Sequence, residues 1–305
     1  MAAAVAVASL LASCHPGANV DFDARVAAPA FAGGRVTLLF DQGHHNYHRL
    51  DTTYAPFAAL ARNDGLKVKA LAGPLTNPAL AGGQILAIVS ARADTDTNDA
   101  PAFSRAETEG ILSWVRNGGS LLLVTDHYPF PNAVEGLANA LGLDVAKGMT
   151  FDSGQFRQGS NDESRLIFSR ANHLLAAHPI VEGRNRAERV GLVETFTGDA
   201  FRPRSGAIVP VMRLGATAVN RLGTPSVATK GGDTVVTVNF GKPVPAAGWC
   251  QGAAFALGKG RVVVLAEAAM ITAQEDGGRR IGMNAPGNDN RQFLLNILNW
   301  LGRAF

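Results

Sequence analysis

Histidine and carboxylate side chains gather in three short segments of this 305-residue chain. Residues 41–48 read Asp-Gln-Gly-His-His-Asn-Tyr-His, residues 126–128 read Asp-His-Tyr, and residue 267 is a glutamate after an apolar run. The first two segments hold four of the seven histidines. A histidine beside a carboxylate is held in one tautomer and can transfer protons near neutral pH. These segments are the candidate site.

Three kinds of site fit these residues. The first is a metal site for zinc or a similar divalent ion, since His44, His48 and Asp126 offer nitrogen and oxygen ligands, although their spacing matches no established zinc signature. The second is acid–base catalysis without a metal, in which His127, Asp126 and Glu267 are the catalytic residues. The third is a binding pocket, or a set of hydrogen-bonded polar groups, that carries out no reaction.

A pocket for a small molecule or a glycan would use further polar side chains near the same segments. Two of its residues, Asn284 and Asn290, come just before or at the start of the last predicted helix, and helix N-termini favour anions. The alternative for this stretch is ordinary capping of the helix by Asn288 or Asp289. The expected ligand-binding residues are Asp41, His44, Asn46, His48, Asn284 and Asn290.

The sequence offers no obvious nucleophile. No serine lies in a Gly-x-Ser-x-Gly turn after a predicted strand. The chain has two cysteines, which are too few for a disulfide scaffold or a four-cysteine zinc site. Cys250 falls inside a predicted strand, where we expect a small buried side chain.

The elements that must position the site follow from short apolar runs that alternate with helical periodicity. Such runs are typical of strands buried on both faces of a parallel sheet, and the alternation predicts helices on both faces. Because parallel strands share their carboxyl end, we expect the three segments to meet at one edge of the sheet. The predicted strands are 35–40, 66–71, 84–90 and 120–125, and the predicted helices are 53–63, a helix opened by a capping box at Ser104 and Glu107, and 132–141.

The second half of the chain is less regular. Residues 144–245 are rich in Gly, Arg, Asp and Ser, and we expect strands at 190–196, 207–212 and 233–240 in an elaboration of the same domain. Strands 249–257 and 261–266, joined by Gly258-Lys-Gly260, predict an antiparallel hairpin. A helix capped by Asp289 ends the chain. We therefore expect one domain over residues 35–305.

Four motifs give the chain a resemblance to a known superfamily: residues 40–48, the Gly-Gly strand that ends in Asp126-His127, His178-Pro-Ile-Val-Glu-Gly183, and 260–267. They resemble the class I glutamine amidotransferase-like superfamily, and most closely its bacterial branch called the domain of unknown function 4350 family. The resemblance implies a three-layer, flavodoxin-like α/β sandwich with a mostly parallel sheet. Where true amidotransferases carry a cysteine after the Gly-Gly strand, this chain has Thr125-Asp126-His127, so glutaminase chemistry is not expected.

The N-terminus resembles an export signal. Residues 2–13 are small and apolar, and Leu11-Ala12-Ser13-Cys14 resembles a bacterial lipobox, in which Cys14 would be lipidated. We interpret residues 1–14 as a lipoprotein-type signal peptide that ends at Cys14, and residues 15–34 as a linker. The alternatives are an N-terminal tail with no such role and a Cys14–Cys250 disulfide. The expected location is the bacterial cell envelope, lipid-anchored or periplasmic.

Composition limits the partners. The formal net charge is +3 with 17% charged residues and no basic block, which argues against nucleic-acid binding. No segment has the roughly 18 uninterrupted apolar residues of a membrane span, so membrane contact is expected through the lipid only. Two functions remain: a hydrolase-like enzyme that uses a His/carboxylate site without a cysteine nucleophile, and a non-catalytic module that binds a ligand, a carbohydrate or a partner.

Overall fold

A computed structural model describes residues 17–18, 21–93, 100–230 and 233–305. Within these ranges, it describes only the backbone of residues 227–230 and 233–237. The described helices are α1 (Ala55–Asn63), α2 (Asn77–Leu80), α3 (Arg105–Arg116), α4 (Phe130–Ala140), α5 (Pro179–Glu182) and α6 (Asn290–Leu301), with 3-10 turns η1 (Arg186–Glu188) and η2 (Ala269–Ile271). The strands are β1 (Gly17–Ala18), β2 (Thr37–Asp41), β3 (Lys67–Leu71), β4 (Ile85–Val89), β5 (Ser120–Val124), β6 (Leu143–Val145), β7 (Gly148–Asp152), β8 (Ile167–Ser169), β9 (Leu192–Glu194), β10 (Phe201–Pro203), β11 (Val209–Arg213), β12 (Ala218–Lys230), β13 (Asp233–Pro245), β14 (Cys250–Leu257), β15 (Gly260–Leu265), β16 (Ala273–Asp276) and β17 (Arg279–Gly282).

The main sheet has the order β3-β2-β4-β5-β15-β14-β10-β6, and β11 pairs with β14. The first five strands in this order are parallel to one another. Every residue of β2, β4 and β5 is buried, as continuous apolar strands require when both faces are covered. The predicted α/β fold with a mostly parallel central sheet is confirmed.

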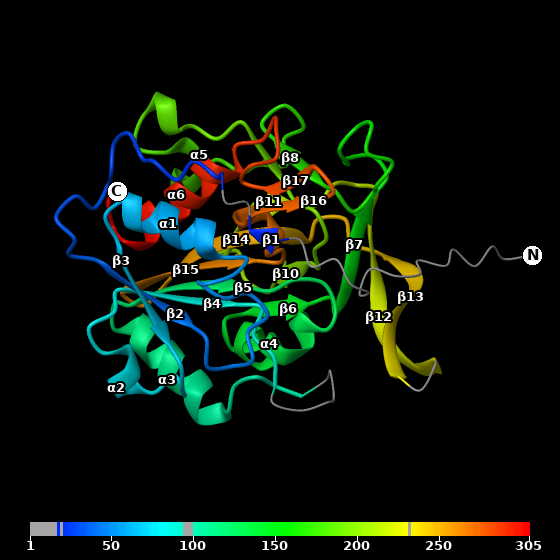
Figure 1. Cartoon of the computed structure of the whole chain (residues 1–305), viewed down its shortest axis with the longest axis horizontal. Helices are drawn as coiled ribbons and strands as arrows, with labels where there is room; N and C mark the ends of the chain where they lie inside the picture. The colour runs from blue at the N-terminus through cyan, green and yellow to red at the C-terminus, as the bar shows by residue number, and fades with distance from the viewer. Residues whose placement is uncertain (1–16, 19–20, 94–99, 231–232) are drawn as a thin grey trace, which may run out of the picture.

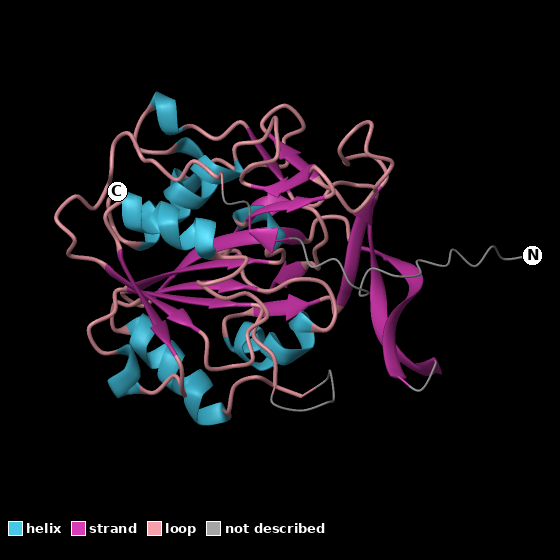
Figure 2. Ribbon diagram, viewed as in Figure 1, coloured by secondary structure: helices cyan, strands magenta, loops and turns pink. Residues whose placement is uncertain are grey.

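Helices cover both faces of this sheet and make three layers (Figures 1 and 2). α1, α5 and α6 lie on one side, and α2, α3 and α4 lie on the other. Each side has its own apolar core. Phe57 and Ile297 belong to the first, and Ile111 and Val134 belong to the second.

The antiparallel hairpin of β14 and β15 is present, with β15 running parallel to β5. Gly258 has a φ of +61°, and a Cβ at Gly260 would come within 2.2 Å of the carbonyl oxygens of Val115 and Gly119. Glycine is therefore required at the turn, where the hairpin passes close to the end of α3.

The irregular region forms two small sheets and adds β10 and β11 to the main sheet. β12 and β13 form a long antiparallel hairpin, and the start of β12 also pairs with β7. The hairpin projects from the body of the molecule in Figure 1. The sequence predicts a strand at 233–240, whereas β13 extends to Pro245, and its partner β12 was not predicted. β8 and β9 form a separate two-stranded sheet.

The segment expected to be a linker packs against the body over much of its described length. Gly17 and Ala18 pair with β16, and Phe31 is a buried core residue. The backbone of Phe31 donates a 2.9 Å hydrogen bond to the carbonyl oxygen of Asp64 at the end of α1. Residues 21–34 therefore differ from a linker, because their apolar side chains supply part of one core. The signal-peptide prediction and Cys14 lie outside the described residues.

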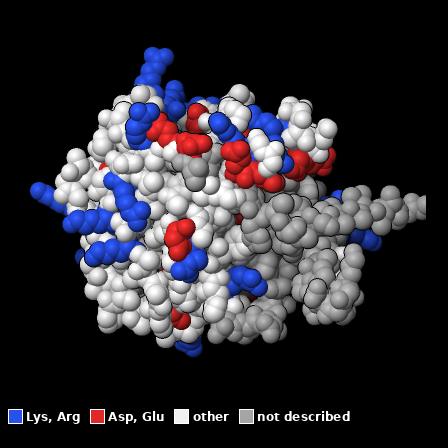
Figure 3. Space-filling model, in the orientation of Figure 1, with Lys and Arg blue, Asp and Glu red and all other residues white. Residues whose placement is uncertain are grey.

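Charges of both signs are interspersed on the face shown in Figure 3, where Lys/Arg and Asp/Glu side chains lie together along the upper part. No helix in the described ranges is long and apolar enough to cross a membrane. Cys250 is a free, fully buried residue of β14, and burial raises the pKa of its thiol to about 12.

Candidate functional site

The three polar segments follow β2, β5 and β15, at the carboxyl ends of three strands of the parallel sheet. Asp41 is the last residue of β2, Asp126 comes two residues after β5, and Glu267 comes two residues after β15. The backbone ties the segments together across strands, since Thr125 donates to the carbonyl of Leu265 at 2.9 Å. Parallel strand direction therefore brings these residues to one edge.

His44 is held between two carboxylates. Its Nδ1 lies 2.9 Å from Oδ1 of Asp41, and its Nε2 lies 2.9 Å from Oε1 of Glu107 at the start of α3. Asn46 completes the arrangement by donating to Oδ2 of Asp41 at 3.1 Å and to the carbonyl of Val89 at 3.0 Å. These contacts fix the loop after β2 against α3.

This arrangement favours a charged imidazole. Burial lowers the pKa of His44, but hydrogen bonds with Asp41 and Glu107 outweigh burial, so that its pKa is raised. The pKa of Glu107 is lowered to about 2 because hydrogen bonds from Ser104, Leu75 and His44 outweigh its own burial. The two carboxylates therefore stabilise the charged form of His44.

The proposed zinc ligands do not converge. The two nitrogens of His44 point to opposite sides of its ring, each toward a different carboxylate, whereas zinc ligands must meet one ion at about 2.0–2.2 Å. Nδ1 of His48 lies 2.6 Å from the hydroxyl of Thr53. Among the described residues, no group of three or more His, Cys, Asp or Glu side chains is arranged to hold a metal ion.

His48 is a buried neutral residue. Burial lowers its pKa to about 3. Its ring packs 4.8 Å from that of Tyr54 and 4.9 Å from that of Tyr47, measured between centroids. His48 therefore contributes packing under the loop rather than a charge.

Asp126 and Glu267 form a buried pair of carboxyl groups. Asp126 accepts hydrogen bonds from the backbone N–H groups of His127 at 2.7 Å and Ala268 at 3.3 Å. Glu267 accepts from the N–H groups two and three residues further along the chain, at 2.9 and 2.7 Å. Burial raises the pKa of Asp126, and burial together with the charge of Asp126 raises the pKa of Glu267 well above its usual range.

His127 does not form the expected hydrogen bond with a carboxylate. Its Nδ1 lies 2.7 Å from the carbonyl oxygen of Tyr128, which can only accept, so Nδ1 carries the proton. Its Nε2 lies 3.9 Å from Oδ1 of Asp126, beyond hydrogen-bonding distance. The side chain is 29% exposed, so the imidazole faces solvent more than its neighbouring carboxyl does.

The rings of Tyr47, His127 and Phe130 pack together near Asp126. Tyr47 is 44% exposed, and its ring lies edge-on to Phe130 at 5.9 Å. His127 lies 6.2 Å from the same Phe130 ring. The backbone N–H of Tyr47 donates to the carbonyl of Ser90 after β4, which places the tyrosine over this edge of the sheet. We call Tyr47, His127 and Phe130 the aromatic face.

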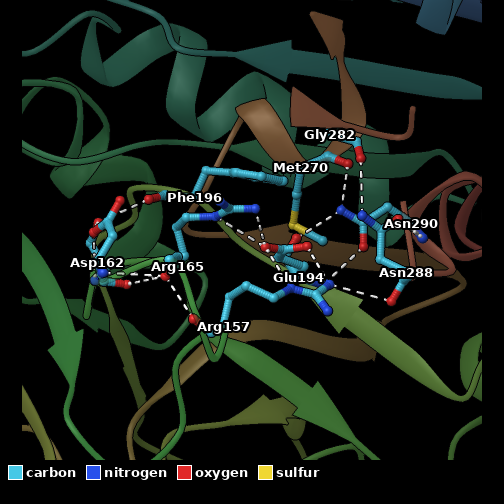
Figure 4. A network of polar contacts seen from close by, with 12 residues as sticks. Arg157, Asp162, Arg165, Glu194, Phe196, Met270, Gly282, Asn288 and Asn290 are labelled. Atoms are coloured by element: carbon cyan, nitrogen blue, oxygen red, sulfur yellow. Dashed lines mark hydrogen bonds and ion pairs between the residues drawn. The ribbon is translucent and has the colours of Figure 1, made fainter. Parts of the chain in front are cut away.

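The two asparagines expected at the pocket mouth make hydrogen bonds inside the fold. Asn290 is fully buried, donates to the carbonyls of Glu194 and Met270, and accepts from the N–H of Glu194 (Figure 4). Asn284 donates to the carbonyl of Gln274 at 3.2 Å. Asp289 occupies the N-cap position of α6, but its side chain accepts from the backbone of residues 191 and 192 instead of capping the helix.

Next to Asn290 lies a buried ion triad. Glu194 is fully buried and binds two guanidinium groups, those of Arg157 and Arg165, at 2.6 and 2.7 Å (Figure 4). Asn290 and this triad link the irregular region to α6. Neither arginine was predicted from the sequence, because nothing in their spacing relates them to Glu194.

Two residues of the site make long-range contacts that were not predicted from the sequence. Glu107 was predicted as part of a capping box, which is present, and it also binds His44. Tyr54, within the helix predicted over 53–63, is the N-cap residue of α1, and its buried hydroxyl donates to the carbonyl of Ala268 at 2.8 Å, beside Glu267. For Tyr54, the available signal was a hydroxyl on an otherwise apolar core residue.

No family model matches the sequence, and no curated protein matches it either. Solved structures do. The mmIFT52 N-terminal domain aligns with a TM-score of 0.60 at 14% identity over 87% of this chain and 97% of that domain. A ThuA-like protein from Bacteroides uniformis ATCC 8492 aligns at 12% identity and a TM-score of 0.40, over 90% and 93%. A β-galactosidase from Rahnella sp. R3 aligns at 10% identity and a TM-score of 0.41, over 88% of this chain and 31% of the enzyme.

The chain is similar in fold to class I glutamine amidotransferase-like structures. At 14% identity, the likeness to the mmIFT52 domain concerns the fold alone, because one fold supports many functions. Assignment to the domain of unknown function 4350 family stays a prediction.

Proposed function

We propose that this chain is a non-catalytic binding module that holds a neutral glycan or a similar polar small molecule on the aromatic face. The observation that carries the proposal is the half-exposed ring of Tyr47, which lies against Phe130 and near Asp126. The backbone already satisfies the carboxyl groups of Asp126 and Glu267. An aromatic ring offers an apolar surface, and the partly exposed His127 beside it offers polar atoms for hydroxyl groups.

The same geometry disfavours the hydrolase-like alternative. A general acid or base must reach the reacting atoms, but Asp126 and Glu267 are 6% and 0% exposed and accept backbone hydrogen bonds. The imidazole of His127 is oriented by the carbonyl oxygen of Tyr128. A neutral carbonyl stabilises the positive charge of a protonated histidine base less than a carboxylate does.

The test compares Tyr47→Ala with the wild-type chain in isothermal titration calorimetry with chitotetraose and cellotetraose. We expect saturable binding to at least one tetrasaccharide, and at least about tenfold weaker binding by Tyr47→Ala because the stacking surface is lost. Val244→Ala, which removes an exposed apolar side chain from β13, is the matched control and should bind as the wild type does.

Two outcomes would overturn the proposal. The first is binding that Tyr47→Ala leaves unchanged, or no binding of either sugar. The second is turnover: release of nitrophenol from p-nitrophenyl glycosides by the wild-type chain, abolished in Asp126→Asn, would identify an enzyme.

We also propose that the chain is attached to the bacterial cell envelope through a lipid on Cys14. The support is the Leu11–Cys14 motif behind an apolar run. Labelled palmitate should enter the protein in bacterial cells and should be lost in Cys14→Ser. Unlabelled wild-type protein in a soluble fraction would contradict this.

A further inference from the structure

A cavity that shares no lining residue with the aromatic face is lined by arginines. It has a volume of about 410 Å³ and lies between the end of β10, the turn that follows, β11 and Gly248. Arg202, Arg204 and Arg213 all line it. Neither the candidate site nor the proposed function uses these residues.

Only one carboxylate partners these three cations in the described part of the chain. Asp144 of β6 binds Arg202 at 2.8 Å and lies 3.6 Å from Arg204. Arg213 is exposed and has neither an ion pair nor a side-chain hydrogen bond among the described residues. The cavity therefore carries about two uncompensated positive charges.

The fold holds part of this set in place. The guanidinium of Arg202 lies 5.2 Å from the ring centroid of Trp249, and Arg204 donates to the carbonyl of Asn139 at the end of α4. A guanidinium that is already oriented loses less conformational entropy when it binds a ligand. Arg213 remains free to turn toward an incoming group.

We propose that this cavity binds a tetrahedral oxyanion, the phosphate or sulfate group of a small ligand. Guanidinium groups present paired N–H donors that match the oxygens of such anions, and charge-assisted hydrogen bonds are stronger than neutral ones. The exposed hydroxyl of Ser205 in the same lining is a further donor, since its oxygen accepts from the N–H of Ala207. The chemistry is shared by free ions and by organic esters.

The experiment is calorimetric titration of the full chain with sodium sulfate and sodium phosphate, at an ionic strength kept constant with chloride. We expect one saturable site, and at least about tenfold weaker binding in Arg213→Gln, because hydrogen bonds to charged groups are lost. Arg186→Gln removes another exposed arginine, outside this cavity, and should bind as the wild type does. Arg204→Gln is a second cavity variant, and circular dichroism verifies that each variant is folded.

Esters then distinguish the sources of the anion. Tighter binding of glycerol 3-phosphate or glucose 6-sulfate than of the matching free ion supports an organic ligand, and equal binding supports a free-anion site. The proposal is overturned if no titrant gives a saturable heat, if both cavity variants bind like the wild type, or if Arg186→Gln weakens binding as much as Arg213→Gln does.

Discussion

At the scale of single residues, the buried pair of Asp126 and Glu267 links protonation to stability. Burial raises the pKa of both groups, and the charge of Asp126 raises that of Glu267 further. Below about pH 4, unfolded and folded chains both hold these protons. As the pH rises, the unfolded chain releases protons that the folded pair retains, so the free energy of unfolding falls as the pH passes through the raised folded pKa values.

Asp126→Asn should flatten this dependence, because it removes one titrating group and the negative charge beside Glu267. At pH 5 we expect Asp126→Asn to lower the free energy of unfolding by about 1 kcal/mol. The amide nitrogen of the new side chain cannot accept the hydrogen bond that one backbone N–H donates to the carboxylate of Asp126. Urea unfolding at pH 4.5, 6 and 7.5 measures how steeply the free energy of unfolding changes with pH. Part of the slope should persist, because the raised pKa of His44 also makes stability decrease as the pH rises.

The control for this prediction is Asp51→Asn, on an exposed carboxylate whose side chain is 73% accessible. Its pH profile should match that of the wild type. An Asp126→Asn profile as steep as the wild-type one would show that the pair does not hold its protons in the folded state.

At the scale of elements, the N-terminus of α3 joins three parts of the fold. The carboxylate of Glu107 accepts from Ser104 in the capping box and from the backbone N–H of Leu75 at 3.0 Å, and it binds His44 of the loop after β2. A carboxylate in the first turn is also favoured by the helix dipole. One side chain thus fixes α3, the loop before α2 and the edge of the candidate site.

Ser104→Ala and Glu107→Ala should therefore differ. Loss of the cap hydroxyl should cost about 1 kcal/mol. Loss of Glu107 should cost about 2–3 kcal/mol, because a hydrogen bond to a buried imidazole is lost as well. Denaturant unfolding measures both, with the exposed Glu109→Ala on the same helix expected within about 0.5 kcal/mol of the wild type. Equal losses at 104 and 107 would contradict the bridging role.

The elements differ in how far their residues predict them. β2, β4 and β5 were predictable because continuous apolar runs suit only strands covered on both faces. β12 was not, since it contains Gly223 and Pro225, and its pairing depends on distant strands. At the site, the strand ends indicated where polar groups meet. The strand ends did not indicate that His44 would bind Glu107. This partner lies 63 residues further along the chain, in α3, and the tertiary fold brings it to His44.

At the scale of the whole molecule, residues 21–34 act as a strap across one layer. The ring of Phe31 is 8% exposed and lies against Gly302, where a Cβ would come within 2.4 Å of it. Arg184 donates to the carbonyl of Ala28 at 2.8 Å, which brings the region after α5 into contact with the same strap. The start and the end of the described chain are therefore packed into one core.

Phe31→Ala should lower the free energy of unfolding by about 3–4 kcal/mol, because it leaves a cavity between the strap and α6. Chemical denaturation measures the loss. Val244→Ala, at a side chain that is 58% exposed, should change stability by less than about 0.5 kcal/mol. A small loss for Phe31→Ala would mean that the strap is not part of the cooperative unit.

Cys250 has a consequence for kinetics. Its sulfur lies 3.5 Å from the carbonyl oxygen of Phe201 in a fully buried position, and alkylating reagents attack only an accessible thiolate. In a Cys14→Ser chain it is the sole sulfhydryl. Iodoacetamide should then modify native protein only during transient separation of β14 from its neighbours. Mass spectrometry would measure the rate of Cys250 modification in native protein and in urea. The comparison gives the rate at which the central sheet opens, and no labelling site has to be added to the chain.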